Sequence, residues 1–135
     1  MKQPPRRRKL MKENDDIKIE LTLTDRQAKV VMRACEFYAR VVLGQFQEIT
    51  TELLDLSLET DDYCERRDNA DALLLEARKY IYPELHGRGH SYGIGKFEHA
   101  DRAFDVYQVI RALYGDPRGT FSYYDLPEAR IKKEK

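Results

Sequence analysis

Apolar and polar residues alternate strictly near the start of the chain. Ile17, Ile19, Leu21 and Leu23 occupy every second position, and charged or hydroxyl side chains lie between them. A period of two is typical of a β-strand with one buried face. The pattern therefore predicts a strand over residues 17–24.

A helix is predicted immediately after this strand. Thr24 and Gln27 have capping-box spacing, in which each side chain accepts a hydrogen bond from the backbone amide of the other residue. Steps of three and four residues place side chains on one face of a helix. The apolar positions with these steps are Val31, Cys35, Tyr38, Val42, Phe46, Ile49, Leu53 and Leu56. We therefore expect one helix up to about Leu58, with Gly44 marking a bend or a close helix contact.

Two more helices and a second strand are predicted further along the chain. Residues 62–82 carry an apolar stripe that ends before Pro83, because proline disfavours helical geometry at the preceding residue. Residues 98–114 carry another stripe, which Gly115 terminates. An aromatic run over residues 120–124 then predicts a short strand.

The order strand, three helices, strand predicts an α+β fold. In the simplest arrangement, three amphipathic helices pack on a short antiparallel β-ribbon made from the N- and C-terminal strands. The open edges of this ribbon favour a homodimer with a four-stranded sheet. Residues 17–127 form a single α+β domain in this interpretation, between a disordered basic arm at 1–16 and a charged tail at 128–135.

Composition narrows the class of function. The 135 residues carry 24 basic and 24 acidic side chains, so no net field draws the whole chain to nucleic acid or to a membrane. No apolar run has the length of a membrane helix, and the N-terminus lacks the apolar segment of a secretory signal. Cys35 and Cys64 lack Cys-x-x-Cys spacing, which is typical of reduced thiols. We therefore expect a cytoplasmic protein.

The segment between the second and third predicted helices is the best candidate for a binding site. Four of the seven glycines lie here, among basic and aromatic side chains. Closely spaced glycines let backbone amides approach an anion, and the N-terminus of the following helix attracts negative charge. We expect an anionic small molecule or a nucleotide to bind, although the spacing matches neither the Walker nor the dinucleotide fingerprint. The expected ligand-binding residues are His86, Arg88, Gly89, His90, Tyr92, Gly93, Gly95, Lys96 and Arg111.

Metal binding and catalysis have less support in the sequence. Glycines separate His86, His90 and His99, and no carboxylate is placed beside them by pattern. No serine elbow, cysteine–histidine pair or pair of carboxylates has the spacing that catalysis requires. We therefore expect a non-enzymatic protein without a metal or a cofactor.

Two stretches of the chain resemble small uncharacterised phage and prophage proteins. They are Leu23-Thr24-Asp25-Arg26-Gln27-Ala28 running through Phe37-Tyr38-Ala39-Arg40 to Leu43-Gly44-Gln45-Phe46-Gln47-Glu48-Ile49, and Ser91-Tyr92-Gly93-Ile94 followed by Ala103-Phe104-Asp105-Val106-Tyr107-Gln108-Val109-Ile110-Arg111. The resemblance implies no catalytic residues. It implies a protein of the host-cell cytoplasm that binds a host protein, a nucleic acid or a nucleotide signal used in host defence.

Three functions remain open from the sequence. The first is binding of an anionic small molecule, such as a nucleotide signal, by the glycine-rich loop in a counter-defence role. The second is inhibition or regulation of a host protein through the acidic segment at 48–71 or a tyrosine-bearing helix face. The third is nucleic-acid binding by the basic arm at 1–16, which the neutral net charge disfavours.

Overall fold

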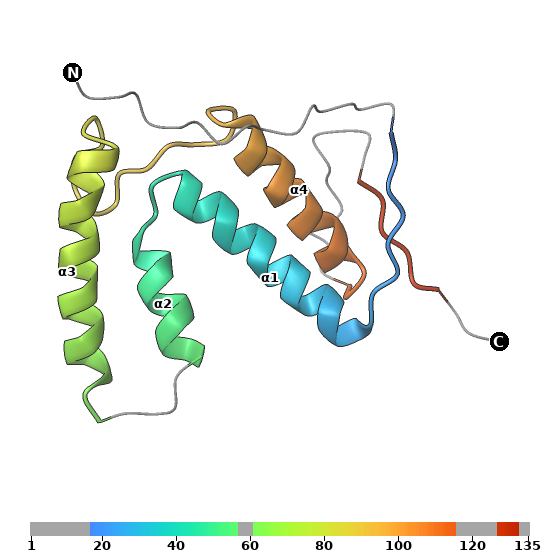
Figure 1. The fold of residues 1–135 in the computed structure, drawn as a ribbon, viewed down its shortest axis with the longest axis horizontal. Helices are drawn as coiled ribbons and strands as arrows, with labels where there is room; N and C mark the ends of the chain where they lie inside the picture. The colour runs from blue at the N-terminus through green and yellow to red at the C-terminus, as the bar shows by residue number, and fades with distance from the viewer. Residues whose placement is uncertain (1–16, 57–60, 116–126, 133–135) are drawn as a thin grey trace, which may run out of the picture.

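The computed structural model describes residues 17–56, 61–115 and 127–132. Within these ranges the chain forms four helices, which are α1 (Asp25–Val42), α2 (Gln47–Leu56), α3 (Tyr63–Ile81) and α4 (Glu98–Ala112). Figure 1 shows α1 and α4 side by side, with α2 between α1 and α3. The fold is therefore built from two helix pairs, α1 with α4 and α2 with α3.

The predicted α+β fold is wrong for the described residues, which are helical and contain no strand. Three of the alternating apolar side chains, Ile17, Ile19 and Leu21, are exposed. A strand needs a neighbour to pair its backbone groups and a core to cover its apolar face. In the described part of the chain, residues 17–24 form no strand, and most of their apolar side chains are exposed. The second predicted strand at 120–124 and the basic arm at 1–16 lie outside the described residues.

The capping box at the start of α1 is confirmed. Thr24 Oγ1 accepts a hydrogen bond from the Gln27 amide at 3.1 Å, and Gln27 Oε1 accepts one from the Thr24 amide at 3.0 Å. The expected single helix is wrong, because the chain turns between Leu43 and Phe46. The bend expected at Gly44 is confirmed, with a φ of 95° that glycine adopts without the penalty of a Cβ atom.

The two later helices agree with the sequence prediction at their ends. α3 stops one residue before Tyr82, and α4 starts at Glu98 as expected. The acidic residues Glu98 and Asp101 lie in the first turn of α4, where they complement the helix dipole. Asp62 precedes α3 but makes no side-chain capping hydrogen bond.

The core of the described residues is small and partly polar. The buried apolar residues are Ala39, Phe46, Leu85, Ala100 and Ile110, and the buried polar ones are Thr50, Asp71, Arg78 and Asp105. Buried polar groups cost free energy unless they are hydrogen-bonded, so specific polar contacts have to support this fold. Among the described residues, no helix is both long and apolar enough to cross a membrane.

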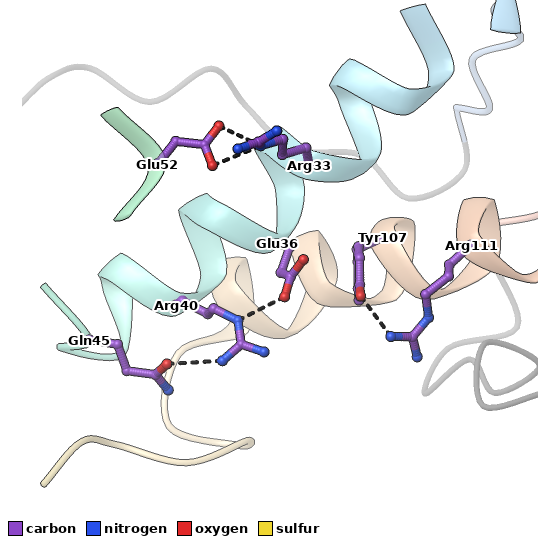
Figure 2. A network of polar contacts seen from close by, with 7 residues as sticks. All are labelled: Arg33, Glu36, Arg40, Gln45, Glu52, Tyr107 and Arg111. Atoms are coloured by element: carbon purple, nitrogen blue, oxygen red, sulfur yellow. Dashed lines mark hydrogen bonds and ion pairs between the residues drawn. The ribbon is translucent and has the colours of Figure 1, made fainter. Parts of the chain in front are cut away.

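Two arginines of α1 make polar contacts toward α2 and the turn that precedes it. Figure 2 shows Arg33 against Glu52 of α2, with Nε at 2.7 and 2.8 Å from the two carboxylate oxygens. Arg40 bonds Glu36 within α1 at 2.9 Å and donates to Gln45 Oε1 across the turn at 3.1 Å. These side chains are partly exposed, so each pair contributes at most about 1 kcal/mol. The Arg33–Glu52 pair joins α1 to α2, and the Arg40–Gln45 bond joins α1 to the turn.

A second polar cluster joins the start of α1 to the end of α4. Asp25 forms an ion pair with Lys29 at 3.0 Å and accepts a hydrogen bond from the Tyr114 hydroxyl at 2.8 Å. The Lys29 ammonium also lies 5.3 Å from the centre of the Tyr114 ring. The hydrogen bond from Lys29, and then the one from Tyr114, hold the pKa of Asp25 below its ordinary value of 3.8.

This cluster predicts a dependence of stability on acid pH. Because the folded-state pKa of Asp25 is lowered, its stabilising contribution is complete above pH 3.8 and is lost as the pH falls through the folded-state value. We expect Asp25→Asn to melt below wild type at pH 7, with the difference in Tm shrinking as the pH is lowered below 3.8. Melting followed by circular dichroism over this range checks it, and a difference that stays constant with pH would contradict it.

Candidate functional site

The glycine loop, residues 82–97, connects α3 to α4 and is held by one buried side chain. Arg78 of α3 is only 2% exposed. Its Nη1 donates to the carbonyls of Gly44 at 3.1 Å and His90 at 2.8 Å, and its Nη2 donates to the carbonyl of Gly87. The planar guanidinium has enough donors in a fixed geometry to reach all three carbonyls. Arg78 thus joins the turn after α1 to the glycine loop.

The loop also covers the C-terminal end of α1. The Tyr92 amide donates to the Leu43 carbonyl at 2.9 Å, and the Tyr82 hydroxyl donates to the Val42 carbonyl at 2.8 Å. The last carbonyls of a helix have no partner within the helix, so these bonds satisfy groups that α1 leaves open. Burial raises the pKa of Tyr82, which keeps this hydroxyl a donor at neutral pH.

Aromatic rings fill the space beneath the loop. Tyr92 packs edge-on against Tyr82 and Phe97, with ring centres 5.3 and 5.4 Å apart, and Phe46 lies 6.0 Å from Tyr82. The Lys96 ammonium lies 5.1 Å from the centre of the Tyr92 ring, within cation–π range. Tyr92 and Lys96, expected to stack on a ligand and to bind its charge, therefore contact each other.

Arg88 reaches a carboxylate instead of projecting freely. Its Nη2 lies 2.6 Å from Oδ2 of Asp71, a nearly buried residue in the middle of α3. The other oxygen, Oδ1, is buried and has no hydrogen-bond partner among the described residues. Both side chains line a cavity of about 10 Å³, together with Phe46, Gln47, Leu75 and Arg78. This cavity has room for about one water molecule.

Several amides of the glycine loop, including those of His90, Tyr92 and Gly95 in the segment expected to face an anion, have partners within the protein. The His86 amide donates to Nδ1 of His90 at 2.9 Å, and the Gly95 amide donates to both carboxylate oxygens of Asp101 at 3.1 Å. The backbone amides of His90, Tyr92 and Lys96 each donate a hydrogen bond to a backbone carbonyl. Many of the backbone amides in the glycine loop are therefore already hydrogen-bonded within the protein.

Arg111 does not lie with the other expected ligand residues. It is in the last turn of α4, about 20 Å along the helix from the end that meets the loop, at 1.5 Å per residue. Its Nη1 donates to the Tyr107 hydroxyl at 2.6 Å, as Figure 2 shows. Gly89 and Gly93 have open space around them and remain accessible.

The structure adds a groove that the sequence did not indicate. It lies between the last turns of α3 and the start of the glycine loop, has a volume of about 410 Å³ and is open to solvent. Its lining residues are Leu75, Arg78, Lys79, Pro83, Leu85, His86 and Gly87. The walls are mainly apolar, while Lys79 and His86 are exposed, and none of these lining residues is acidic. The only signal in the sequence is a pair of apolar residues, Pro83 and Leu85, just beyond the helix end.

The described residues contain no group of three or more histidine, cysteine, aspartate or glutamate side chains that could hold a metal ion. No protein-family model, curated protein or solved structure matches the chain. The geometry of the groove and the loop is therefore the basis for interpreting the site.

Proposed function

We propose that the protein binds a partner protein through the groove between α3 and the glycine loop, and that the bound segment carries an apolar side chain beside carboxylates. The groove is the observation that carries this proposal. Its volume of about 410 Å³ falls within the range of known ligand sites. The apolar walls favour an apolar side chain of the partner, and the cationic edge favours carboxylates beside it.

The walls explain the apolar part of the partner. Leu75, Pro83 and Leu85 give the groove an apolar surface into which a side chain of the size of leucine can insert. Burial of such a side chain contributes about 1.5–3 kcal/mol.

The openness of the groove favours a protein segment over a small molecule. Small-molecule sites enclose most of the ligand surface, whereas this groove is partly open to solvent. A protein segment needs only to lay one or two side chains into such a groove, as helices and peptides do at many interfaces.

The edge of the groove explains the acidic part of the partner. Within the described ranges, Lys79 pairs with Glu76 alone, at 2.9 Å on the exposed surface of the same helix. An exposed pair of this kind contributes little, so a carboxylate of the partner can replace Glu76 at low cost. His86 adds a second donor at the same edge.

Of the three functions open from the sequence, this geometry favours the second, binding of a host protein. The surface differs from those expected, since it is neither the acidic segment at 48–71 nor a tyrosine-bearing helix face. The anion site in the loop has weaker support, because Arg88, Lys96 and several amides are engaged within the protein. We place this activity in the host-cell cytoplasm, on the basis of the resemblance to phage proteins.

Selection from a random peptide library on the immobilised protein tests the proposal. We expect enriched peptides to share an apolar residue flanked by Asp or Glu. The double variant Lys79→Glu/His86→Glu should bind the enriched peptide at least about tenfold more weakly, which corresponds to 1.4 kcal/mol. Arg26→Glu, at an exposed position in the first turn of α1, is the matched control and should bind as wild type does. Equal binding by the double variant and the control would refute the proposal.

A further inference from the structure

Only one side of α3 is covered by the rest of the described structure. Its buried residues, Asp71 and Arg78, face α2 and the glycine loop. Leu73 and Tyr80 are 73% and 81% exposed. Among the described helices, α3 packs against α2 alone, and it lies at the edge of the molecule in Figure 1. In the part of the chain that the structure describes, one long face of α3 is therefore without a partner.

The exposed residues of this face follow a regular spacing. The steps between them alternate between four and three residues, which is the heptad spacing of helices that pair side by side. We call these residues the outer stripe, and they are Asp62, Arg66, Asn69, Leu73, Glu76 and Tyr80. All six are exposed, so the stripe is available to a second helix.

We propose that two copies of the chain associate through their outer stripes, with the two α3 helices antiparallel. The charges along the stripe favour this arrangement. With the two-fold axis at the level of Asp71, Arg66 lies opposite the partner subunit's Glu76. In the same register, Asp62 lies opposite the partner subunit's Tyr80, whose hydroxyl can donate to the carboxylate. Each of these pairings occurs twice because the dimer is symmetric.

The middle of the stripe fits the same register. Asn69 lies opposite the partner subunit's Leu73, so the two leucines flank the axis and cover each other's exposed surface. A parallel pair in register would place Arg66 against the partner subunit's Arg66 and Glu76 against the partner subunit's Glu76. Like charges in contact are repulsive, so the sequence of the stripe selects the antiparallel orientation.

The dimer is expected to be reversible. Each copy contributes only two large apolar side chains to the stripe, Leu73 and Tyr80, and obligate interfaces are more apolar than this. The proposed groove is lined by Leu75 and Lys79, which lie outside the stripe. A dimer would present two grooves at once and strengthen binding to any partner with two matching segments. The dimer does not depend on the groove, and either proposal can fail alone.

Charge reversal across the stripe tests the register. Sedimentation equilibrium of the full-length protein over a concentration series should show a monomer–dimer equilibrium for wild type. Arg66→Glu and Glu76→Arg each place like charges opposite each other, and each should raise the dissociation constant at least about tenfold. An equimolar mixture of the two variants should form a heterodimer, because Arg66→Glu in one copy then meets Glu76→Arg in the other, while the native pair remains at the second contact.

Two outcomes would overturn the inference. One is a wild-type protein that stays monomeric at the highest soluble concentration. The other is a mixture of the two variants that associates no better than either variant alone. Circular dichroism and melting of each variant distinguish loss of association from loss of folding. Arg26→Glu serves again as the charge-reversal control, since Arg26 lies on α1 and not on the stripe.

Discussion

Replacement of Arg78 by leucine is expected to lower the free energy of unfolding by about 3–5 kcal/mol, or to prevent folding altogether. The side chain is buried and donates to the carbonyls of Gly44, Gly87 and His90. Leucine fills a similar space but donates no hydrogen bond, so the Gly44 and His90 carbonyls lose their bonds from Arg78. The Gly87 carbonyl keeps only the bond that it accepts from the His90 amide. The bond to the Gly44 carbonyl is buried, and a buried carbonyl left unsatisfied costs about 1–3 kcal/mol.

Urea unfolding followed by circular dichroism measures this effect. Lys79→Leu makes the same change at the next residue of α3, where the side chain is exposed, and it should alter stability by no more than about 0.5 kcal/mol. The free energy of unfolding of Arg78→Lys should lie between those of Arg78→Leu and Lys79→Leu. An ammonium keeps the charge but lacks the planar guanidinium that reaches several carbonyls. Equal stability of Arg78→Leu and Lys79→Leu would show that the three carbonyl bonds do not hold the loop.

Replacement of Gly44 by alanine is the second change with a large expected effect, a loss of about 2–4 kcal/mol. A Cβ atom at this position would lie 2.5 Å from Cδ1 of Leu85, which is buried. The backbone φ of 95° is also unfavourable for any residue with a side chain. Both causes act at the turn that separates α1 from α2.

Gly89→Ala is the matched control for this substitution. Gly89 has no positive φ, and nothing lies within 4 Å of the Cβ that alanine would add. This variant should be neutral or slightly stabilising, by up to about 1 kcal/mol. The double variant Gly44→Ala/Leu85→Ala removes the contact but not the backbone strain. If Gly44→Ala unfolds at the same urea concentration as Gly89→Ala, the turn tolerates a side chain and its described geometry is wrong.

Local signals in the sequence predicted local structure well. The capping box at Thr24 and Gln27 marked the first residue of α1 correctly, because both partners lie within one turn. The limits of α3 and α4 followed from a proline, a glycine and the apolar spacing between them. Gly44 was also correctly identified as a bend, although the stripe that continues past it suggested one long helix.

Features that depend on distant residues were not predictable from the pattern. Strict alternation over residues 17–24 is necessary for a half-buried strand but not sufficient, since pairing and cover come from elsewhere in the chain. Arg78 was missed for a related reason. Its partners are backbone carbonyls, which every residue has, so no particular side chain in the sequence could reveal them. The pairing of Arg88 with Asp71 likewise joins residues that no spacing rule connects.

The arrangement of the two helix pairs sets the order in which the molecule can assemble. α2 and α3 are consecutive in the chain. α1 and α4 are separated by α2, α3 and the glycine loop, so their contact closes a much longer stretch of chain. Closing a longer stretch of chain costs more entropy, so we expect the α2–α3 hairpin to form first and the α1–α4 pair to close last. During synthesis the hairpin, and the outer stripe with it, emerges from the ribosome before α4 does. Two growing chains could therefore meet through α3 before either has completed the loop that forms the groove.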